Sequence, residues 1–396
     1  MAAEQVRKGI LVVHGIGRHA ESSTLLEMGA PLLQWVLDWM RLRGRTAWLE
    51  RGGLATAETD DLSSLPPAHV SLRVEPSVPD AGDGLHWIMA EAWWAASVQK
   101  PRLSDISSWT FCNFVRCGFD LNKHLTDRRV RLAHPRGTDP ELWARAVDLA
   151  NNVLTSALFW VGFVVAIPFV ALALILTQVP VPAIQKFTVV HVLEAFLNSN
   201  MADMQALVQD EVQAASIRGR ILRALEWLVR QGCSELYVIA HSGGVVAAFE
   251  TLCQASNPEQ ERPEIVRRVK KFFSLGEGLN KAWLIDGQQP RWRIPLEPSI
   301  AWRDFWSAYD PVPVTPLRQE LRTLQSQSSN PITSLQVTNR MDLATDHGAY
   351  WHNDEQVISR MAQEIDAAEP GESQFVLPRL AEHVRQRRRR VSVLVA

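Results

Sequence analysis

Hydrophobic residues recur along most of this chain in short β-branched runs, separated by longer stretches with helical periodicity. Strands are expected at residues 9–14, 70–75, 235–240, 269–275, 301–309 and 332–338. Helices are expected at residues 25–43, 192–229 in one or two pieces, 245–255 and 354–368. Strands that alternate with helices usually form a mostly parallel sheet with helices on both faces. The pattern therefore predicts an α/β fold.

One stretch interrupts this alternation because it is apolar throughout. Residues 149–185 contain no Asp, Glu, Lys or Arg, and residues 153–179 are almost purely apolar. About 20 such residues suffice for a helix to cross a bilayer. Pro168 lies in the middle of the run, where a proline removes one backbone hydrogen bond and kinks or breaks a helix. The pattern favours membrane contact over a buried core helix.

Composition narrows the class of protein. The 396 residues are 46% hydrophobic and 21% charged, so a large core can form and global disorder is excluded. The formal charge of −2 argues against a generally basic nucleic-acid-binding protein. Four cysteines are too few for a disulfide scaffold in a chain this long, and they lack zinc-ligand spacing. The apolar stretch near the N-terminus is too short for a secretory signal, so a cytosolic setting is the default expectation.

The strongest chemical motif follows the predicted strand at 235–240. Ala240-His241-Ser242-Gly243-Gly244 places a serine among small residues where a strand passes directly into a helix. Such a tight turn strains the backbone of the serine and lifts its hydroxyl above the sheet. Ser242 is therefore the candidate nucleophile, and the alternative is a serine that caps the following helix.

A serine hydroxyl is a poor nucleophile at neutral pH, so it needs a base, and a carboxylate must orient that base. Asp310 follows the predicted strand at 301–309, and His347 lies in a polar loop after the strand at 332–338. Ser242, Asp310 and His347 thus have the expected chain order, each past the end of a strand. Other residues keep both roles open, namely Asp304, Asp346 and Glu277 for the acid and His352 and His383 for the base. Asp310 also has an ordinary alternative, which is a solvated turn aspartate.

Acyl transfer further requires two hydrogen-bond donors aimed at one oxyanion. The Gly243 N–H is the first candidate. The first predicted strand ends in His14-Gly15-Ile16-Gly17, and its glycines permit a close approach of the backbone. The Ile16 N–H is the second candidate donor, and His14, Gly15 and Gly17 are expected to support the loop.

With these motifs the sequence resembles the α/β-hydrolase superfamily, specifically its serine lipases and esterases. The run Leu11-Val-Val-His-Gly-Ile-Gly-Arg-His is similar to the oxyanion strand and loop of phospholipase A1-like lipases. Residues 240–244 are similar to the nucleophile elbow of the superfamily and depart from G-x-S-x-G only at Ala240. The resemblance covers residues 9–16, 234–255 and 300–350 well and the middle of the chain hardly at all.

The resemblance implies an α/β-hydrolase fold and the hydrolysis of a carboxylic ester through an acyl-enzyme on Ser242. It implies Asp310 as the acid and His347 as the base, with no metal or organic cofactor. Two other functions remain open. One is a serine hydrolase that acts on an amide, thioester or peptide, and the other is a non-catalytic, membrane-anchored interaction module on a hydrolase scaffold.

The chain is expected to divide around the apolar run. Residues 1–83 and 232–370 would form two parts of one hydrolase domain, 84–231 a helical, membrane-associating insertion, and 371–396 a basic tail. Site residues on both sides of the run require both flanks in one compartment, which a single membrane crossing forbids. The simplest resolution is a hairpin bent near Pro168 that enters one leaflet, and a second is one long helix along the enzyme, as a lid or against a partner subunit. The hairpin or the lid is favoured over the third alternative, a sheet that excludes residues 1–150.

The expected partners are a membrane and a hydrophobic ester, such as a glycerophospholipid or an acylglycerol. The basic residues at 123–136 and the five arginines within 385–390 suit an anionic leaflet, with the catalytic domain on the cytoplasmic side. The alternative for each basic run is a solvated face or tail. Four tryptophans are expected either at the depth of the lipid headgroups or in the core, namely Trp87, Trp93, Trp94 and Trp160. No nucleic-acid partner is expected, and a homo-oligomer is left open.

Overall fold

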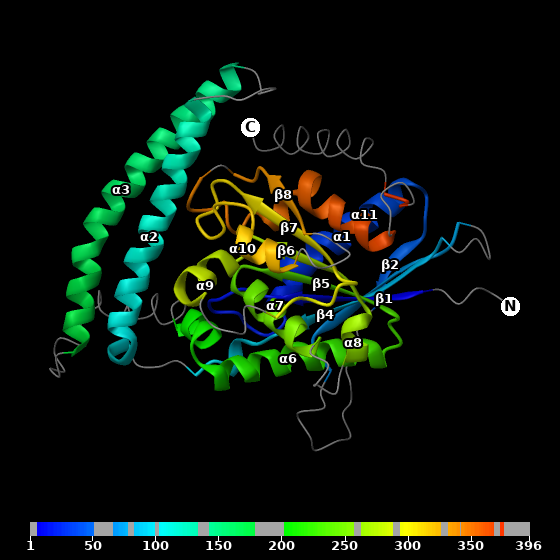
Figure 1. Ribbon diagram of the computed structural model, residues 1–396. Helices are drawn as coiled ribbons and strands as arrows, with labels where there is room; N and C mark the ends of the chain where they lie inside the picture. The colour runs from blue at the N-terminus through cyan, green and yellow to red at the C-terminus, as the bar shows by residue number, and fades with distance from the viewer. Residues whose placement is uncertain are drawn as a thin grey trace.

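A computed structural model shows a central eight-stranded sheet covered by helices on both faces (Figure 1). It describes residues 6–50, 66–77, 83–99, 103–133, 142–178, 202–256, 263–287, 294–325, 332–340, 342–367 and 373–375. The predicted tail at 371–396, including the arginines at 385–390 and His383, lies almost entirely outside these residues. The α/β class predicted from the sequence is confirmed.

The sheet is mixed but mostly parallel, with the strand order β2-β3-β4-β1-β5-β6-β7-β8. Its strands are β1 (Arg7–Val13), β2 (Ala47–Glu50), β3 (His69–Val74), β4 (Leu85–Ala92), β5 (Glu235–His241), β6 (Val269–Leu275), β7 (Ala301–Ser307) and β8 (Thr333–Val337). The strands from β4 to β8 pair in parallel, whereas β3 is antiparallel to both of its neighbours. All six strands expected from the sequence are present.

The pairing of β1 with β5 decides how the two halves of the chain meet. Val13, before the apolar run, lies opposite Ala240, after it. The carboxyl ends of both strands therefore lie at the same edge of the sheet, where the loop at 14–17 meets the Ser242 turn. The alternative in which residues 1–150 lie outside the sheet is wrong.

The predicted start of the helical insertion at residue 84 is also wrong. Residues 85–92 form β4, which pairs with β1 and β3 and is buried along its whole length. A strand buried on both faces lacks the alternation of polar and apolar residues that marks a half-exposed strand. Trp87 and Trp94 belong to the core, so the core alternative is the correct one for these two, and the half-buried Trp93 donates from Nε1 to the His19 carbonyl.

Helices cover the two faces of the sheet in two groups. One face carries α6 (Glu211–Arg230), α7 (Gly243–Ala255), α8 (Pro263–Arg267), α9 (Leu279–Asp286) and α10 (Gln319–Gln325). The other face carries η1 (Leu25–Gly29), α1 (Ala30–Leu42), η5 (Tyr350–His352), η6 (Asp354–Ile358) and α11 (Ser359–Asp366). Although α6 lies inside the predicted insertion at 84–231, it packs on β1 and β4, so it belongs to the α/β domain.

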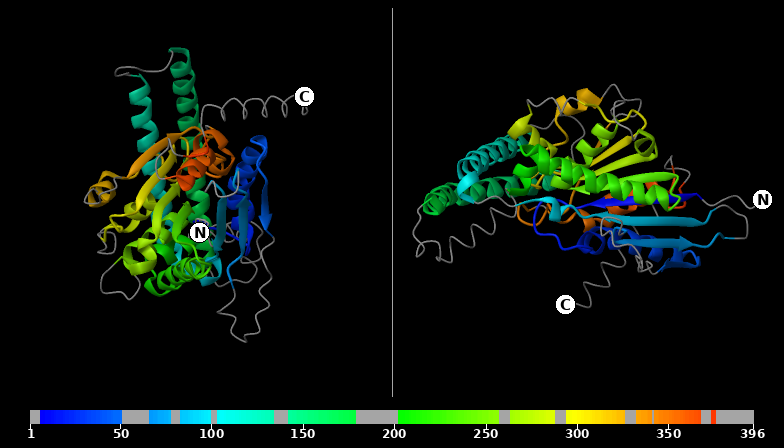
Figure 2. Two further views of the ribbon diagram at one scale, coloured as in Figure 1. Left: turned by 90° about the vertical axis from the view of Figure 1, so that its right-hand side faces the viewer. Right: turned by 90° about the horizontal axis from the view of Figure 1, so that it is seen from below.

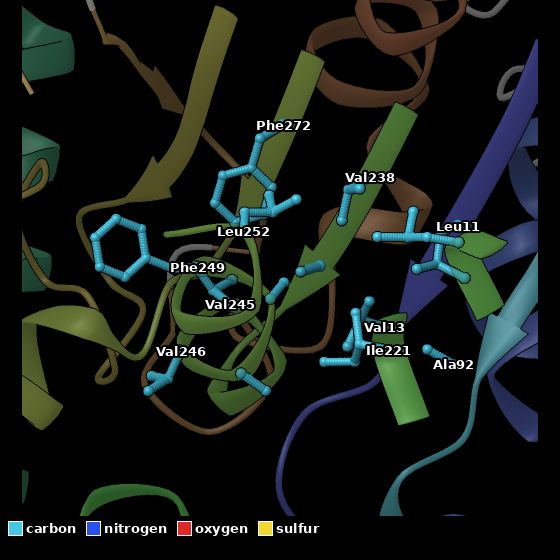
Figure 3. Packing of buried hydrophobic residues seen from close by; sticks show 14 of the residues in the cluster. Leu11, Val13, Ala92, Ile221, Val238, Val245, Val246, Phe249, Leu252 and Phe272 are labelled. Carbon is cyan, nitrogen blue, oxygen red and sulfur yellow. The ribbon is translucent and has the colours of Figure 1, made fainter. Parts of the chain in front are cut away.

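Alternate residues of each central strand point into the two cores. Leu11 and Val13 of β1 pack with the α6–α7 side, and Ile10 and Val12 pack with the α1–α11 side. Figure 3 shows the first of these cores, where Val245 and Phe249 of α7 lie close to the sheet. This packing fixes the position of α7, which begins directly after Ser242.

Two long helices leave this body as an antiparallel pair. These helices, α2 (Leu103–Ala133) and α3 (Leu142–Gln178), run side by side along one flank of the sheet (Figures 1 and 2). The α3 helix continues through Pro168, so the hairpin predicted to bend there does not form within residues 142–178. The α3 helix is continuous over residues 142–178 and packs against α2, in agreement with the alternative of one long helix. By length and composition alone, the segment Asp148–Leu172 could cross a membrane.

Candidate active site

The turn between β5 and α7 holds Ser242 in a left-handed backbone conformation. Its φ is 56° and its ψ is −127°, which is unusual for a residue other than glycine. The Ser242 N–H donates to Leu275 O at 3.1 Å, and the Gly278 N–H donates to Ser242 O at 3.0 Å. The Ser242 hydroxyl makes no capping hydrogen bond to the described N-terminus of α7. The helix-capping alternative is therefore wrong, and the hydroxyl is left available for other chemistry.

Glycines allow the loop after β1 to approach this turn. A Cβ added at Gly244 would lie 2.1 Å from His14 O, and one added at Gly15 would lie 2.7 Å from Ser242 Cβ. A Cβ added at Gly243 would lie 3.4 Å from Ile16 N. The structure therefore brings the two predicted oxyanion donors, the N–H groups of Ile16 and Gly243, into the same small region beside Ser242.

The buried imidazole of His14 holds this loop against β4. His14 Nδ1 donates to Gly15 O at 2.8 Å, and His14 Nε2 accepts from the Trp94 N–H at 3.1 Å. Trp94 Nε1 donates to His14 O at 2.9 Å, and the two rings stack with centroids 4.6 Å apart. Burial, and then the neighbouring His19, lower the pKa of His14 to about 3. His14 is thus a neutral ring that supports the loop.

A further anchor fixes the outer part of the same loop. The Gly17 N–H donates to Asp203 Oδ2 at 2.7 Å, with Gly17 at a φ of 118°. Asp203 is buried in a short helix at 202–208. The sequence analysis did not single out Asp203, and it considered Trp94 only for headgroup depth or the core, because the contacts of both residues join segments that are distant along the chain. Gly17, by contrast, has the loop-supporting place that was predicted for it.

Asp310 and His347 form a tight pair beside this turn. His347 Nδ1 lies 2.9 Å from each carboxylate oxygen of Asp310. Asp310 is fully buried and also accepts hydrogen bonds from Tyr350 Oη at 2.8 Å and from the Val312 N–H at 2.9 Å. The solvated-turn alternative for Asp310 is therefore wrong. Because Nδ1 donates to the carboxylate, Nε2 of His347 is the nitrogen that can accept a proton.

Tyr350 completes the surroundings of the carboxylate. Its hydroxyl accepts the Ser307 N–H at 3.0 Å while it donates to Asp310. Burial, followed by the negative charge of Asp310, raises the pKa of Tyr350 well above its ordinary value. The phenol therefore stays protonated and keeps donating. The sequence held one clue to this role, since Tyr350 is only three residues beyond His347.

His241 links the pair to the Ser242 turn. His241 Nε2 donates to His347 O at 2.9 Å, and the two imidazole rings have centroids 4.5 Å apart. Desolvation, and then His347, lower the pKa of His241 to about 3, so His241 remains neutral. Because His241 immediately precedes Ser242, this contact places His347 at the same end of β5 as the candidate nucleophile.

The loop after β6 touches all three candidate catalytic residues. Gly276 has a φ of 54°, and a Cβ added there would lie 2.7 Å from Asp310 Oδ2 and 3.1 Å from His347 Nδ1. Two residues later, the Gly278 N–H holds the Ser242 carbonyl. The carboxyl ends of β5, β6 and β7 therefore converge at one edge of the sheet, and only a glycine fits under the acid–base pair.

The other carboxylates proposed for the acid role bind elsewhere. Asp304 accepts from Ser274 Oγ, Ser334 Oγ and the Leu317 N–H, and burial raises its pKa to about 6. Asp346 Oδ1 accepts the Arg340 N–H. Glu277 accepts the Asn280 N–H at the start of α9, and burial raises its pKa. Asp310 is therefore the carboxylate that the structure pairs with His347.

The rival base His352 is exposed on η5, and His383 lies outside the described residues. Within the described part of the chain, no group of three or more His, Cys, Asp or Glu side chains is arranged to hold a metal ion. No protein-family model, curated protein or solved structure matches this chain.

Proposed function

We propose that this protein is a serine hydrolase with an α/β-hydrolase fold that cleaves carboxylic esters at a membrane. The observation that carries the proposal is the strained Ser242 turn beside a histidine that a buried aspartate orients. The strand order supports it as well, because the turn follows the central strand β5 and the acid follows β7. The nearby N–H groups of Ile16 and Gly243 suit an oxyanion.

The reaction would proceed in two steps. His347 Nε2 takes the proton from Ser242 Oγ as that oxygen attacks the acyl carbonyl, and the N–H groups of Ile16 and Gly243 stabilise the oxyanion. His347 then gives the proton to the departing alcohol, which leaves the acyl group on Ser242. Water repeats the attack with His347 as the base, and the acid product is released. Asp310 stabilises the imidazolium in both steps.

Lipid esters, either phospholipids or acylglycerols, are the proposed substrates. The apolar helix α3 runs along the flank of the body, and its side chain Asp148 bonds Tyr309, the residue before Asp310. A membrane in contact with the apolar part of α3 would therefore lie close to the loop that carries Asp310. Amides and thioesters could react by the same chemistry. Rates measured on an anilide and a thioester with the same acyl group as the ester would distinguish these substrate classes.

The decisive experiment compares Ser242→Ala with the parent protein on a short p-nitrophenyl ester. We expect hydrolysis to fall by a factor of about 1,000 or more, because the nucleophile is removed. Ser108→Ala, at an exposed serine on α2, is the matched control and should keep the parent rate. A fluorophosphonate probe should label the parent at Ser242. If Ser242→Ala hydrolyses the ester at the parent rate, the nucleophile assignment is wrong, and an unlabelled parent favours the non-catalytic interaction module.

A further inference from the structure

The α3 helix exposes a continuous apolar surface on the side that faces away from the body. Its members, each at least 44% exposed, are Val153, Leu154, Leu158, Val161, Val164, Val165, Phe169, Leu172 and Ile175. We call these nine residues the outer stripe. From its first to its last member the stripe is about 33 Å long at 1.5 Å per residue. A soluble protein rarely leaves so long an apolar surface in water without a partner.

The opposite side of α3 is occupied by α2. Phe163 is buried against Phe114, with ring centroids 5.5 Å apart, and against Phe119 at 6.0 Å. A Cβ added at Gly118 would lie 2.2 Å from the Phe163 ring, so the two helices approach closely at this glycine. The α3 helix is therefore already paired on one side, and the outer stripe is what remains for a partner.

Charged side chains join α2 to the α/β domain and α2 to α3. Asp120 of α2 accepts from Lys281 of α9 at 2.7 Å and lies 3.7 Å from Arg318. Arg128 of α2 bonds both carboxylate oxygens of Asp148 at 2.9 Å. These contacts are largely shielded from water, so they are screened less than exposed ion pairs.

The same pair of helices contacts the loop that carries Asp310. Tyr309 Oη donates to Asp148 Oδ1 at 2.6 Å. Val314, in the same loop, has a φ of 58° and packs against Leu121 and Leu125 of α2. A β-branched residue keeps such a conformation only where its surroundings enforce it. The position of α2 therefore helps to set the conformation of this loop.

This attachment limits how a membrane could meet α3. The strands β4 and β5 precede and follow the two helices in the chain, and both flank β1 in one sheet. The chain therefore enters and leaves the helix pair on the same side of any bilayer. A crossing by α3 would also draw the charged residues of α2 into hydrocarbon, which is costly. A partner must therefore lie against the outer stripe rather than surround α3.

We propose that the outer stripe rests in one leaflet of an anionic lipid membrane, with α3 parallel to the membrane plane. This is the geometry of an amphipathic helix that lies in the interface. The α2 helix then holds the loop that carries Asp310 at a fixed distance from the membrane. The proposal rests on the proposed function in one respect, namely that this placement would present membrane esters to the site.

Charge favours lipid over a second copy of the chain. Arg116 and Lys123 are exposed on α2, three residues before and four residues after Phe119, and so on the same face of the helix. Phe119 in turn contacts Trp160 of α3, with ring centroids 6.0 Å apart. A second copy placed on the stripe would bring the same two positive charges to this edge. Anionic headgroups would complement them.

The first test measures binding to vesicles of phosphatidylcholine and phosphatidylglycerol in equal amounts. Val161→Glu combined with Phe169→Glu, made in a Ser242→Ala background, should weaken binding by about tenfold or more, because both carboxylates would enter the leaflet. Val212→Glu, at an 81% exposed valine of α6, is the matched control and should bind like its parent. Parent-level binding by the double variant would overturn the proposal. So would a dimer in light scattering that the double variant converts to monomers, because a second copy would then cover the stripe.

The second test separates a helix lying in the membrane plane from a span. With Cys112 and Cys117 replaced by serine, Leu158→Cys and Ile175→Cys would each carry a fluorescent label, and quencher lipids would report the depth of each label. These positions are about 25 Å apart along α3 at 1.5 Å per residue. Equal shallow depths support the proposal, and depths that differ by most of a leaflet overturn it.

These outcomes are distinguishable from failure of the proposed function. Vesicle binding is measured in protein without the candidate nucleophile, so it does not depend on turnover. Loss of ester hydrolysis with intact binding would overturn the hydrolase alone. Intact hydrolysis of a soluble ester without binding to vesicles would overturn the membrane surface alone.

Discussion

At the scale of single residues, the site depends on a few groups that hold others in place. Ser242 occupies a backbone conformation that costs about 1–3 kcal/mol. Bonds from Ser242 to Leu275 and Gly278 offset that cost. His14 and His241 remain neutral because their surroundings lower their pKa values to about 3. A neutral His241 adds no charge next to His347, the histidine that would have to gain and lose a proton.

Tyr350 offers a test of such positioning. Tyr350→Phe removes a donor from Asp310 and leaves the Ser307 N–H without its acceptor. We expect ester hydrolysis to fall about tenfold, as one charge-assisted hydrogen bond is lost. The acidic limb of the pH–rate profile should move to higher pH, because a less neutralised carboxylate favours the imidazolium more strongly.

Tyr237→Phe is the control for this substitution, since its hydroxyl bonds Glu235 at the opposite end of β5. It should leave both the rate and the pH profile unchanged. A purely structural role for Tyr350 would lower the amount of folded protein without moving the profile, and that result would contradict the positioning role.

Much of the residue-level chemistry was predictable from the sequence. The small residues around Ser242 predict the strained turn, and the structure has Ser242 at a φ of 56°. The sequence favoured Asp310 as the acid by chain order, but it left Asp304, Asp346 and Glu277 open. Asp304 lies within β7, whereas Asp310 and Glu277 lie just past strand ends, and only the three-dimensional hydrogen bonds show which carboxylate faces His347.

At the scale of elements, the largest departures from prediction involve α3 and β4. Pro168 predicts a break, yet α3 runs through it, because a proline removes one hydrogen bond and the surrounding residues continue the helix. The β4 strand was missed because burial on both faces removes the two-residue alternation. In both cases contacts with neighbouring elements outweigh the local pattern.

Gly118 provides a test of the packing between α2 and α3. Gly118→Ala places a Cβ 2.2 Å from the Phe163 ring, and we expect a loss of about 1–3 kcal/mol in stability from this overpacking. Chemical denaturation would measure the change, and limited proteolysis would show whether the helix pair opens first.

Gly162→Ala is the matched control on α3, where a Cβ meets nothing within 4 Å. It should stabilise the helix by up to about 1 kcal/mol, because alanine has the higher helix propensity. Equal effects of the two substitutions would contradict a close approach at Gly118.

At the scale of the whole molecule, one sheet joins chain segments that the apolar run separates. The β1 strand comes before the run and β5 after it, yet they are adjacent. The site, the two cores and the helix pair are therefore parts of one connected body. Acid unfolding should report on that body as a unit.

Buried histidines predict the direction of this pH dependence. The pKa of His14 is about 3 in the folded protein, whereas the ordinary pKa of a histidine is 6.5. Between these two pH values, the unfolded chain therefore binds one more proton at His14 than the folded protein does. Stability should therefore fall as the pH drops through this window. His14 alone should contribute about 2 kcal/mol of that loss between pH 7 and pH 5. Urea unfolding at the two pH values measures the change.

The share due to His14 can be isolated by substitution. His14→Gln should be less stable at pH 7, because it disrupts the contacts with Trp94, but its stability should change less between the two pH values. His352→Gln, at an exposed histidine, should keep the pH dependence of the parent. An unchanged slope in His14→Gln would show that this imidazole does not stay neutral in the folded protein.

The sequence by itself determined the features that depend on neighbouring residues. These include the alternation of strands and helices, the strained serine turn, the chain order of Ser242, Asp310 and His347, and the uncharged length of α3. Only the tertiary structure decided which carboxylate faces His347, that β4 joins the sheet, and that α3 stays whole beside α2. The reason is physical: these outcomes arise from burial, close approach and hydrogen bonds between segments far apart in the chain, which local periodicity does not encode.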